Sequence, residues 1–335
     1  MSFVVDVLQQ MGSQFRSPTL GFLIGGMLVA ALGSKLRIPD AVYQFIVFML
    51  LMRIGLSGGI EIREADVGAM LLPALWSVIV GVTIVLVGST VFSFIPSIRR
   101  EDGIATAGLF GAVSASTLAA AIVLLEEESI TFEAWVPALY PFMDIPALIL
   151  AIVLANVHAA RGTEGETQRP DVVGVVRDSL RSSAISALIL GLALGLLTEP
   201  DPVLESFYDP LFRGFLSVLL LVMGMEAWSR LGELRRVAHW YAVYAFVAPI
   251  LHGLLAFGLG AIAHVVTGFS PGGVILLSVI AASNSDISGP PTLRAAIPSA
   301  NPSAYIGAST SVGTPVSIAI CIPLFIALAE LAFDV

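Results

Sequence analysis

The chain has 335 residues, and only 12% of them are charged, against about 25% in an average soluble domain. Hydrophobic residues make up 57% of the sequence, and its mean hydropathy is +0.93. This composition excludes a water-soluble enzyme, a disordered chain and a nucleic-acid-binding protein, because too little polar surface is present. Long apolar runs also differ from the alternating strands of an outer-membrane barrel. We therefore predict an all-α membrane protein.

Stretches that lack Asp, Glu, Lys and Arg mark the expected membrane-spanning helices, each of which needs about 20 mostly apolar residues. The longest stretch, 237–285, exceeds one span and contains a turn-forming Thr-Gly-Phe-Ser-Pro-Gly-Gly segment at 267–273 that divides it in two. Two other stretches, 41–52 and 214–225, look too short to span easily. Ten helices are predicted in all, within 17–34, 41–52, 67–98, 103–125, 134–160, 182–198, 214–225, the two parts of 237–285, and 295–329.

A long polar segment, 158–181, separates five predicted helices in residues 1–157 from five in residues 182–335. Because five is an odd number, the second half must enter the membrane in the opposite sense. Small residues recur between the halves at an offset near 170, which supports an internal repeat. The matched positions are Gly21 and Gly25 with Gly191 and Gly195, Gly55 with Gly224, and Ser114 with Ser285. We therefore predict two inverted five-helix repeats, as in secondary transporters, whose substrate site lies near the membrane midplane.

Lys and Arg residues in the predicted loops indicate the orientation of the chain. Twelve lie on the membrane side that also holds 158–181, and three lie on the opposite side. Because basic residues are enriched in cytoplasmic loops, 158–181 is predicted to be a cytoplasmic linker and both termini to be periplasmic. The expected location is the plasma (inner) membrane, as a multi-pass protein.

The fourth helix of each half contains small polar residues, at 108–117 (GLFGAVSAST) and 281–292 (AASNSDISGPPT). Pro290 and Pro291 cannot continue a preceding helix but fit the first turn of a new one, with Ser288 as its N-cap. Each new half-helix would point free N–H groups and a partial positive charge at the midplane, where two such ends could bind a small anion. The alternative is a packing seam of small residues.

Two acidic residues, Asp144 and Asp286, fall at membrane depth, where charge is costly and usually functional. Their carboxylates could supply oxygen ligands for Na⁺, and the hydroxyl groups of Ser116, Ser288 and Thr310 could complete the shell. Coupling to protons is an alternative role for either acid, and so is the capping of a broken helix.

Other classes of membrane protein fit less well. An intramembrane aspartyl protease would need a Gly-x-Gly-Asp motif after Tyr208-Asp209, and none follows. A serine protease would need a Gly-x-Ser-x-Gly motif with a partner histidine, and that is also missing. An enzyme is therefore not expected. A channel stays open as an alternative, because paired half-helices also build pores.

Seven segments together resemble the cyanobacterial sodium-dependent bicarbonate transporter family. They are 17–19 (SPT), 54–56 (IGL), 108–117, 140–146 (YPFMDIP), 208–214 (YDPLFRG), 223–230 (MGMEAWSR) and 286–294 (DISGPPTLR). The resemblance implies ten helices in a core and a gate domain, a homotrimer surrounded by membrane lipid, and symport of Na⁺ and bicarbonate for carbon concentration. It also implies inhibition by a PII-like regulatory protein on the cytoplasmic face.

The same resemblance implies where the anion binds. The expected substrate residues are Ala112, Ser114, Ala115, Ser116, Thr117, Asn284 and Ser285. Ala115 stands where the family pattern has Gly, and Asn284 stands where it has Ser. The alternative function is proton-coupled or channel-type transport of another small anion.

Overall fold

The computed structural model describes residues 18–64, 67–162, 173–174, 177, 181, 183–234, 239–286 and 289–333, and it contains only helices and connecting turns within them. The elements of the first half are α2 (Pro18–Ala31), α3 (Asp40–Glu64), α4 (Val67–Ser93), α5 (Arg100–Gly111), α6 (Ala115–Glu127), η1 (Val136–Leu139) and α7 (Tyr140–Gly162).

The second half begins with α9 (Ser183–Leu197), α10 (Asp201–Val203), η2 (Leu204–Tyr208), α11 (Asp209–Leu234), α12 (Trp240–Thr267), α13 (Pro271–Ala282) and α14 (Gly289–Ala296). It ends with α15 (Pro302–Ala308), η3 (Ser309–Gly313), α16 (Thr314–Val316), η4 (Ser317–Cys321) and α17 (Ile322–Phe333). The elements η2, η3 and η4 are π-helical turns, which occur often at functional sites.

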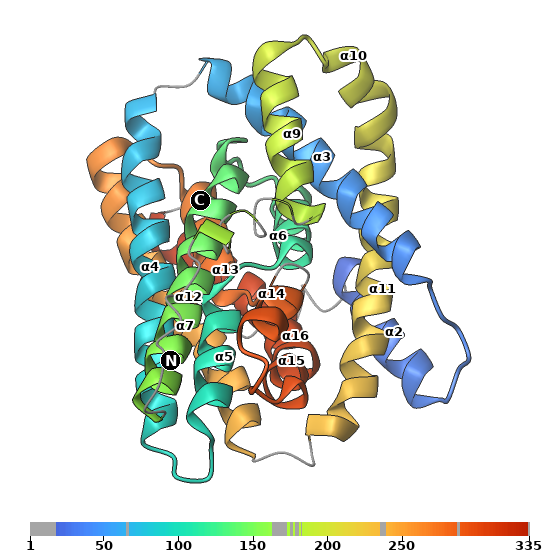
Figure 1. Ribbon diagram of the computed structural model, residues 1–335. Coiled ribbons are helices and arrows are strands. Elements are labelled where there is room, and N and C mark those ends of the chain that lie inside the picture. The colour runs from blue at the N-terminus through green and yellow to red at the C-terminus, as the bar shows by residue number, and fades with distance from the viewer. Residues whose placement is uncertain are drawn as a thin grey trace.

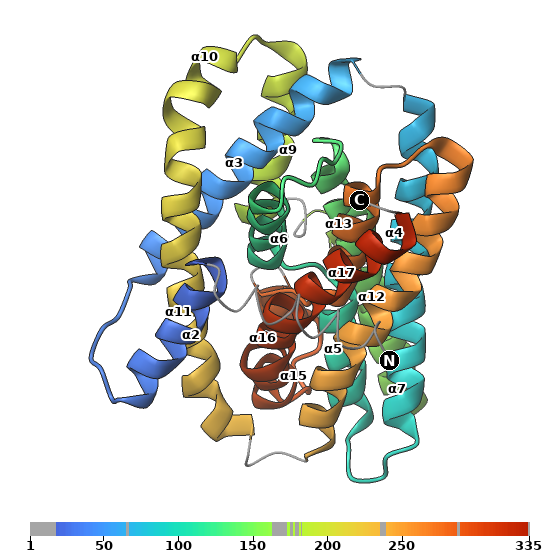
Figure 2. The ribbon, with the colours of Figure 1, turned by 180° about the vertical axis from the view of Figure 1, so that it is seen from behind.

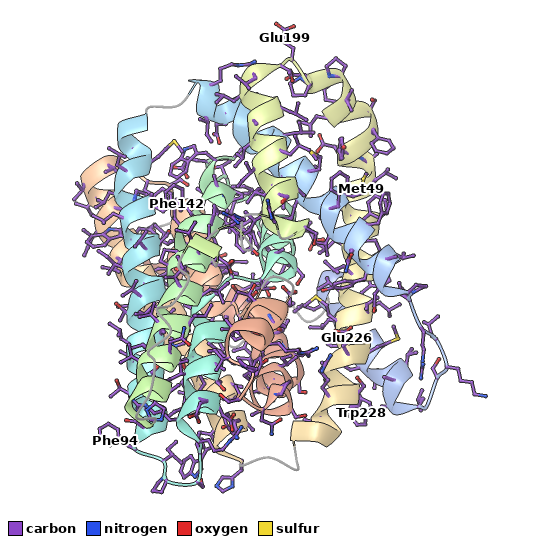
Figure 3. The ribbon with its side chains drawn as sticks, in the orientation of Figure 1. Met49, Phe94, Phe142, Glu199, Glu226 and Trp228 are labelled. Atoms are coloured by element: carbon purple, nitrogen blue, oxygen red, sulfur yellow. The ribbon has the colours of Figure 1, made fainter. Side chains whose placement is uncertain are left out.

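The described residues contain seven helical stretches that are long and apolar enough to cross a membrane, and three shorter apolar helices, Leu20–Ala31, Ile185–Leu197 and Pro271–Ala282. Large apolar side chains cover the outside; Phe94 on the α4 side and Phe142 on α7 are 79% and 49% exposed (Figure 3). Such a surface requires lipid around it. The expectation of an all-α, multi-pass membrane protein is confirmed.

Two groups of helices flank the molecule. Figures 1 and 2 show α2, α3, α9 and α11 on one flank and α4, α7 and α12 on the other. The shorter helices α6, α14, α15 and α16 lie between them (Figure 1). Elements from both halves of the sequence therefore build each flank and the middle.

On the first flank, α3 packs against α9 and α2 packs against α11. A Cβ atom at Gly191 would lie 2.9 Å from the Cα of Gly55, so these two helices touch through their backbones. The α2–α11 crossing is equally close, because Gly224 faces the backbone of Leu23. Gly21 and Gly25, which match Gly191 and Gly195 in the repeat, are surrounded by open space, and the neighbouring Gly26 makes the close contact with Leu221.

The expectation that 41–52 and 214–225 are too short to span is wrong. Helix α3 has 25 residues and α11 has 26, because each continues past the charged side chain that borders the uncharged stretch. Arg53 lies inside α3 and Arg213 inside α11, and both are paired with carboxylates. Pairing reduces the cost of a charge at this depth, so the helix does not have to end there.

Hydrogen bonds tie the start of each interrupted helix to the other half of the chain. The carboxylate of Asp102 at the start of α5 accepts the N–H of Asn301 at 2.7 Å and the guanidinium of Arg99 at 2.8 Å. This carboxylate raises the pKa of Arg99 above its usual value. At the start of α13, the carboxylate of Glu133 accepts both the N–H and the hydroxyl of Ser270. Both interrupted helices are thus anchored at their outer ends.

Candidate functional site at two helix breaks

The first expected interruption lies between α5 and α6. Ala112 and Ser114 have extended backbone conformations, so the chain leaves the helix for three residues before α6 begins. The hydroxyl oxygen of Ser114 accepts the N–H of Thr117 at 3.1 Å and caps the new helix. Ser114, Ser116 and Thr117 are all fully buried.

The second interruption lies between α13 and α14. Helix α13 ends at Ala282, and Ser283 is extended. The hydroxyl oxygen of Ser285 accepts the N–H of Gly289, the first residue of α14, at 2.8 Å. Ser285 therefore holds the start of α14. The predicted N-cap, Ser288, lies outside the described residues, and so its capping and Na⁺-binding roles stay predictions.

The two breaks touch each other inside the protein. The N–H of Ser114 donates to the hydroxyl of Ser283 at 3.0 Å, and the N–H of Ser285 donates to the carbonyl of Leu109 at 2.9 Å. Residues about 170 positions apart in the chain thus form one buried polar cluster, where membrane protein backbone can leave the helix.

Asp286 brings a carboxylate into this cluster. The hydroxyl of Ser116 donates to its Oδ2 atom, and the same hydroxyl lies 3.0 Å from that of Ser114. Among the described residues, the buried Oδ1 atom of Asp286 and the buried hydroxyl of Thr117 have no hydrogen-bond partner. A buried polar atom without a partner costs about 1–3 kcal/mol, so these two atoms fit a site that binds an ion.

Asp144 occupies a different position. Its Oδ1 atom accepts the N–H of Val113 at 2.9 Å, and the residue is fully buried. The carboxylate from α7 therefore stabilises the extended backbone of the first break, which agrees with the capping alternative. The carboxylate of Asp144 thus supports the first break, whereas that of Asp286 contacts Ser116; both belong to one predicted Na⁺ site.

Asn284 is held at the second break by three hydroxyl-bearing residues near the end of the chain. Its Oδ1 atom accepts the hydroxyl groups of Ser309 and of Thr314, the latter at 2.9 Å, and its Nδ2 atom lies 3.4 Å from the hydroxyl of Ser317. Thr314 follows Asp144 by 170 positions, which is the repeat offset, whereas Ser309 and Ser317 were not singled out from the sequence.

Three predicted site residues remain to be placed, namely Ala112, Ala115 and Thr310. Ala112 and Ala115 are 1% and 3% exposed at the first break, and Thr310 lies half-buried in the π-helical turn η3. Ala115 and Ser116 occupy the first turn of α6, where N–H groups have no partner within the helix. Groups of three or more His, Cys, Asp or Glu that could hold a metal ion are not found in the described part of the chain.

A cavity of about 500 Å³ opens between the end of α2 and α11. Arg37, Glu226 and Trp228 are among its lining residues, and Figure 3 shows the last two on α11.

Comparison with protein families gives a match to the Na⁺-dependent bicarbonate transporter superfamily over residues 18–330. The matched region includes both helix breaks and every described residue of the buried cluster. The chain belongs to this superfamily. Among curated proteins, no match is found. Membership in the Na⁺-dependent bicarbonate transporter superfamily confirms the resemblance stated for the sequence and supports a bicarbonate transporter.

Proposed function

We propose that the protein is a secondary active transporter that carries Na⁺ and bicarbonate together into the cell, for inorganic carbon concentration, and is not an enzyme. Membership in the Na⁺-dependent bicarbonate transporter superfamily supports bicarbonate as the substrate. The single observation that carries the proposal is the contact between two broken helices around the partly unpaired carboxylate of Asp286.

The proposed architecture has ten helices in two inverted repeats, residues 1–157 and 182–335, joined by a cytoplasmic linker at 158–181. The crossing of α3 with α9 and that of α2 with α11 support it, because they pair corresponding helices of the two halves in exchanged order. We assign these four helices to a gate domain and the remainder to a core domain. Movement of the core against the gate would expose the cluster to each side in turn.

Bicarbonate would bind at the start of α6, close to the second break. The N–H groups of Ala115 and Ser116, the positive end of the α6 dipole and the hydroxyl of Thr117 supply donors for an anion without any Lys or Arg. Ser114 and Ser285 would hold the two half-helices in register, and Asn284 would line the same space.

Na⁺, as the second substrate, would bind the carboxylate of Asp286 and the hydroxyl of Ser116, since hard cations prefer oxygen ligands. Asp144, Ser288 and Thr310 belong to the proposed shell as well. Cation and anion would then lie next to each other, so each would attract the other in a site of low dielectric constant.

We further propose a homotrimer in the plasma membrane, with both termini periplasmic and a PII-like regulatory protein as partner on the cytoplasmic face. The twelve basic residues on the side of 158–181 support this orientation. Binding of the regulator there could act on the gate domain, because α2 and α11 reach that side.

Uptake of labelled bicarbonate into proteoliposomes tests the proposed function. Uptake should saturate with bicarbonate concentration and should collapse when external Na⁺ is replaced by K⁺ or choline. Equal uptake in all three salts, driven by a pH gradient, would establish proton coupling instead. A conductance that does not saturate would establish a channel.

A further inference from the structure

Arg53 is a charged residue in the interior of α3, and the proposed substrate site does not use it. It follows twelve residues without charge, 41–52, and seven more apolar or small residues separate it from Glu61. Its side chain is only 18% exposed. A charge inside a membrane helix is costly and normally has a function, so its contacts are informative.

Those contacts join three helices. The Nε atom of Arg53 donates to Oδ1 of Asp209 in α11 at 2.7 Å, and one terminal nitrogen donates to Oε1 of Glu126 in α6 at 3.2 Å. Its guanidinium carbon lies 4.5 Å from the ring centre of Phe212, a cation–π contact. Arg213 approaches the other oxygen of Glu126 at 3.7 Å.

The guanidinium groups of Arg53 and Arg213 stabilise the C-terminal end of α6. Helix α6 finishes with Glu126 and Glu127, and Glu128 is its C-cap. The C-terminal end of a helix carries partial negative charge, so acidic residues there destabilise it. Arg53 and Arg213 place positive charge at that end, and both come from helices outside α6.

We infer that Arg53 is a positioning residue for substrate binding. It holds the acidic end of α6 against α3 and α11, and the opposite end of the same helix carries Ser114 and Ser116. With 13 residues, α6 is a rigid rod about 20 Å long. A shift at its acidic end therefore displaces the groups at the helix break. The inference rests on the proposed function.

The test compares two arginines of the same helix in the bicarbonate uptake assay. R53Q removes the ion pairs, and R63Q is the matched control, since Arg63 is exposed and donates to the backbone carbonyl of Thr198. R53Q should raise the half-saturating bicarbonate concentration about tenfold or more, the effect of losing a hydrogen bond to a charged group. R53K should lie between wild type and R53Q, because lysine keeps the charge but cannot reproduce the forked contacts to Asp209 and Glu126 or the stacking on Phe212.

E126Q keeps the test decisive if R53Q does not fold. It removes the negative charge that Arg53 and Arg213 pair with on α6 and leaves Arg53 paired with Asp209, so it should raise the half-saturating concentration in the same direction. The swapped variant R53E/E126R should lie closer to wild type than R53E alone. Unchanged half-saturation in R53Q and E126Q, with only the amount of folded protein reduced, would overturn the inference. A failure of wild-type uptake would instead refute the proposed function.

Discussion

At the first helix break, a carboxylate accepts the backbone: Asp144 takes the N–H of Val113. At the corresponding place in the second break, Asn284 is held by the neutral hydroxyl groups of Ser309 and Thr314. Both devices satisfy buried polar groups, which are otherwise costly in a membrane protein. They differ in charge, because the first break is supported by the carboxylate of Asp144, whereas the second is supported by uncharged hydroxyl groups.

This difference explains why the two acids at membrane depth need not have the same role. The charge of Asp144 is directed at the protein's own backbone. Asp286 has one oxygen that receives the hydroxyl of Ser116 and another that is buried without a partner among the described residues. On the proposed function, Asp286 would therefore contribute its charge directly to the bound Na⁺, whereas Asp144 would add an oxygen ligand while also supporting the first break.

The largest effect is expected from filling the space where the breaks meet. Ser114 is fully buried and contacts Ser283 and Ser116, so S114L places four carbons between the two half-helices. Bicarbonate uptake should be abolished while the protein still inserts into the membrane. The control is S93L, at the exposed end of α4. Normal uptake by S114L would mean that the substrate does not pass between the breaks.

Replacement of the second acid should have the next largest effect. D286N removes the charge and keeps the shape, so the Na⁺ concentration for half-maximal uptake should rise at least about tenfold, equivalent to about 1.4 kcal/mol. E199Q, which changes an exposed acid at one end of the molecule (Figure 3), should leave it unchanged. Wild-type Na⁺ dependence in D286N would leave Asp286 a structural role.

The first acid can be examined by two substitutions that separate hydrogen bonding from charge. D144A leaves the buried N–H of Val113 without an acceptor and should lower the free energy of unfolding by about 1–3 kcal/mol. D144N keeps an acceptor oxygen and should cost less. Denaturant unfolding of the purified protein measures both. If D144A is as stable as the wild type, the carboxylate does not support the first break, and the contrast between the two acids fails.

Loss of a single capping hydroxyl should give the smallest effect. S114A and S285A each remove one acceptor that holds a half-helix but leave its N–H groups in place. A neutral hydrogen bond contributes about 0.5–1.5 kcal/mol, so each variant should weaken apparent bicarbonate affinity roughly 2- to 13-fold. S278A, a buried serine of α13 away from the breaks, is the control. A response in only one of the two variants would mean that one repeat alone holds the anion.

The positions of the breaks could be predicted because local chemistry sets them. Pro290 and Pro291 cannot continue a helix, and Ser114 is a favourable N-cap. The hydrogen-bond partners of Asp144 and Asn284 could not be predicted in this way, since they depend on how α7 and the π-helical turn η3 pack against each break. The lengths of α3 and α11 were missed for the same reason: the charge of Arg53 is balanced by residues distant in sequence.

Family-level function was within reach of the sequence because its motifs extend over nearly the whole chain, as the match to residues 18–330 confirms. The residues that would bind each ion could not be predicted in the same way, because residues about 170 positions apart must first be brought together by folding. Ser283 illustrates this: its hydroxyl supports the first break from the second, and nothing in its own neighbourhood in the sequence indicates that role.

Equilibrium binding to the purified protein tests most directly whether the two breaks form one site for both ions. Calorimetric titration of bicarbonate with and without Na⁺, and of Na⁺ with and without bicarbonate, should show that each ion tightens the other by the same factor, as thermodynamic linkage requires. That factor should fall toward one in D286N. Bicarbonate binding that is independent of Na⁺ in the wild type, or coupling that survives in D286N, would contradict the account.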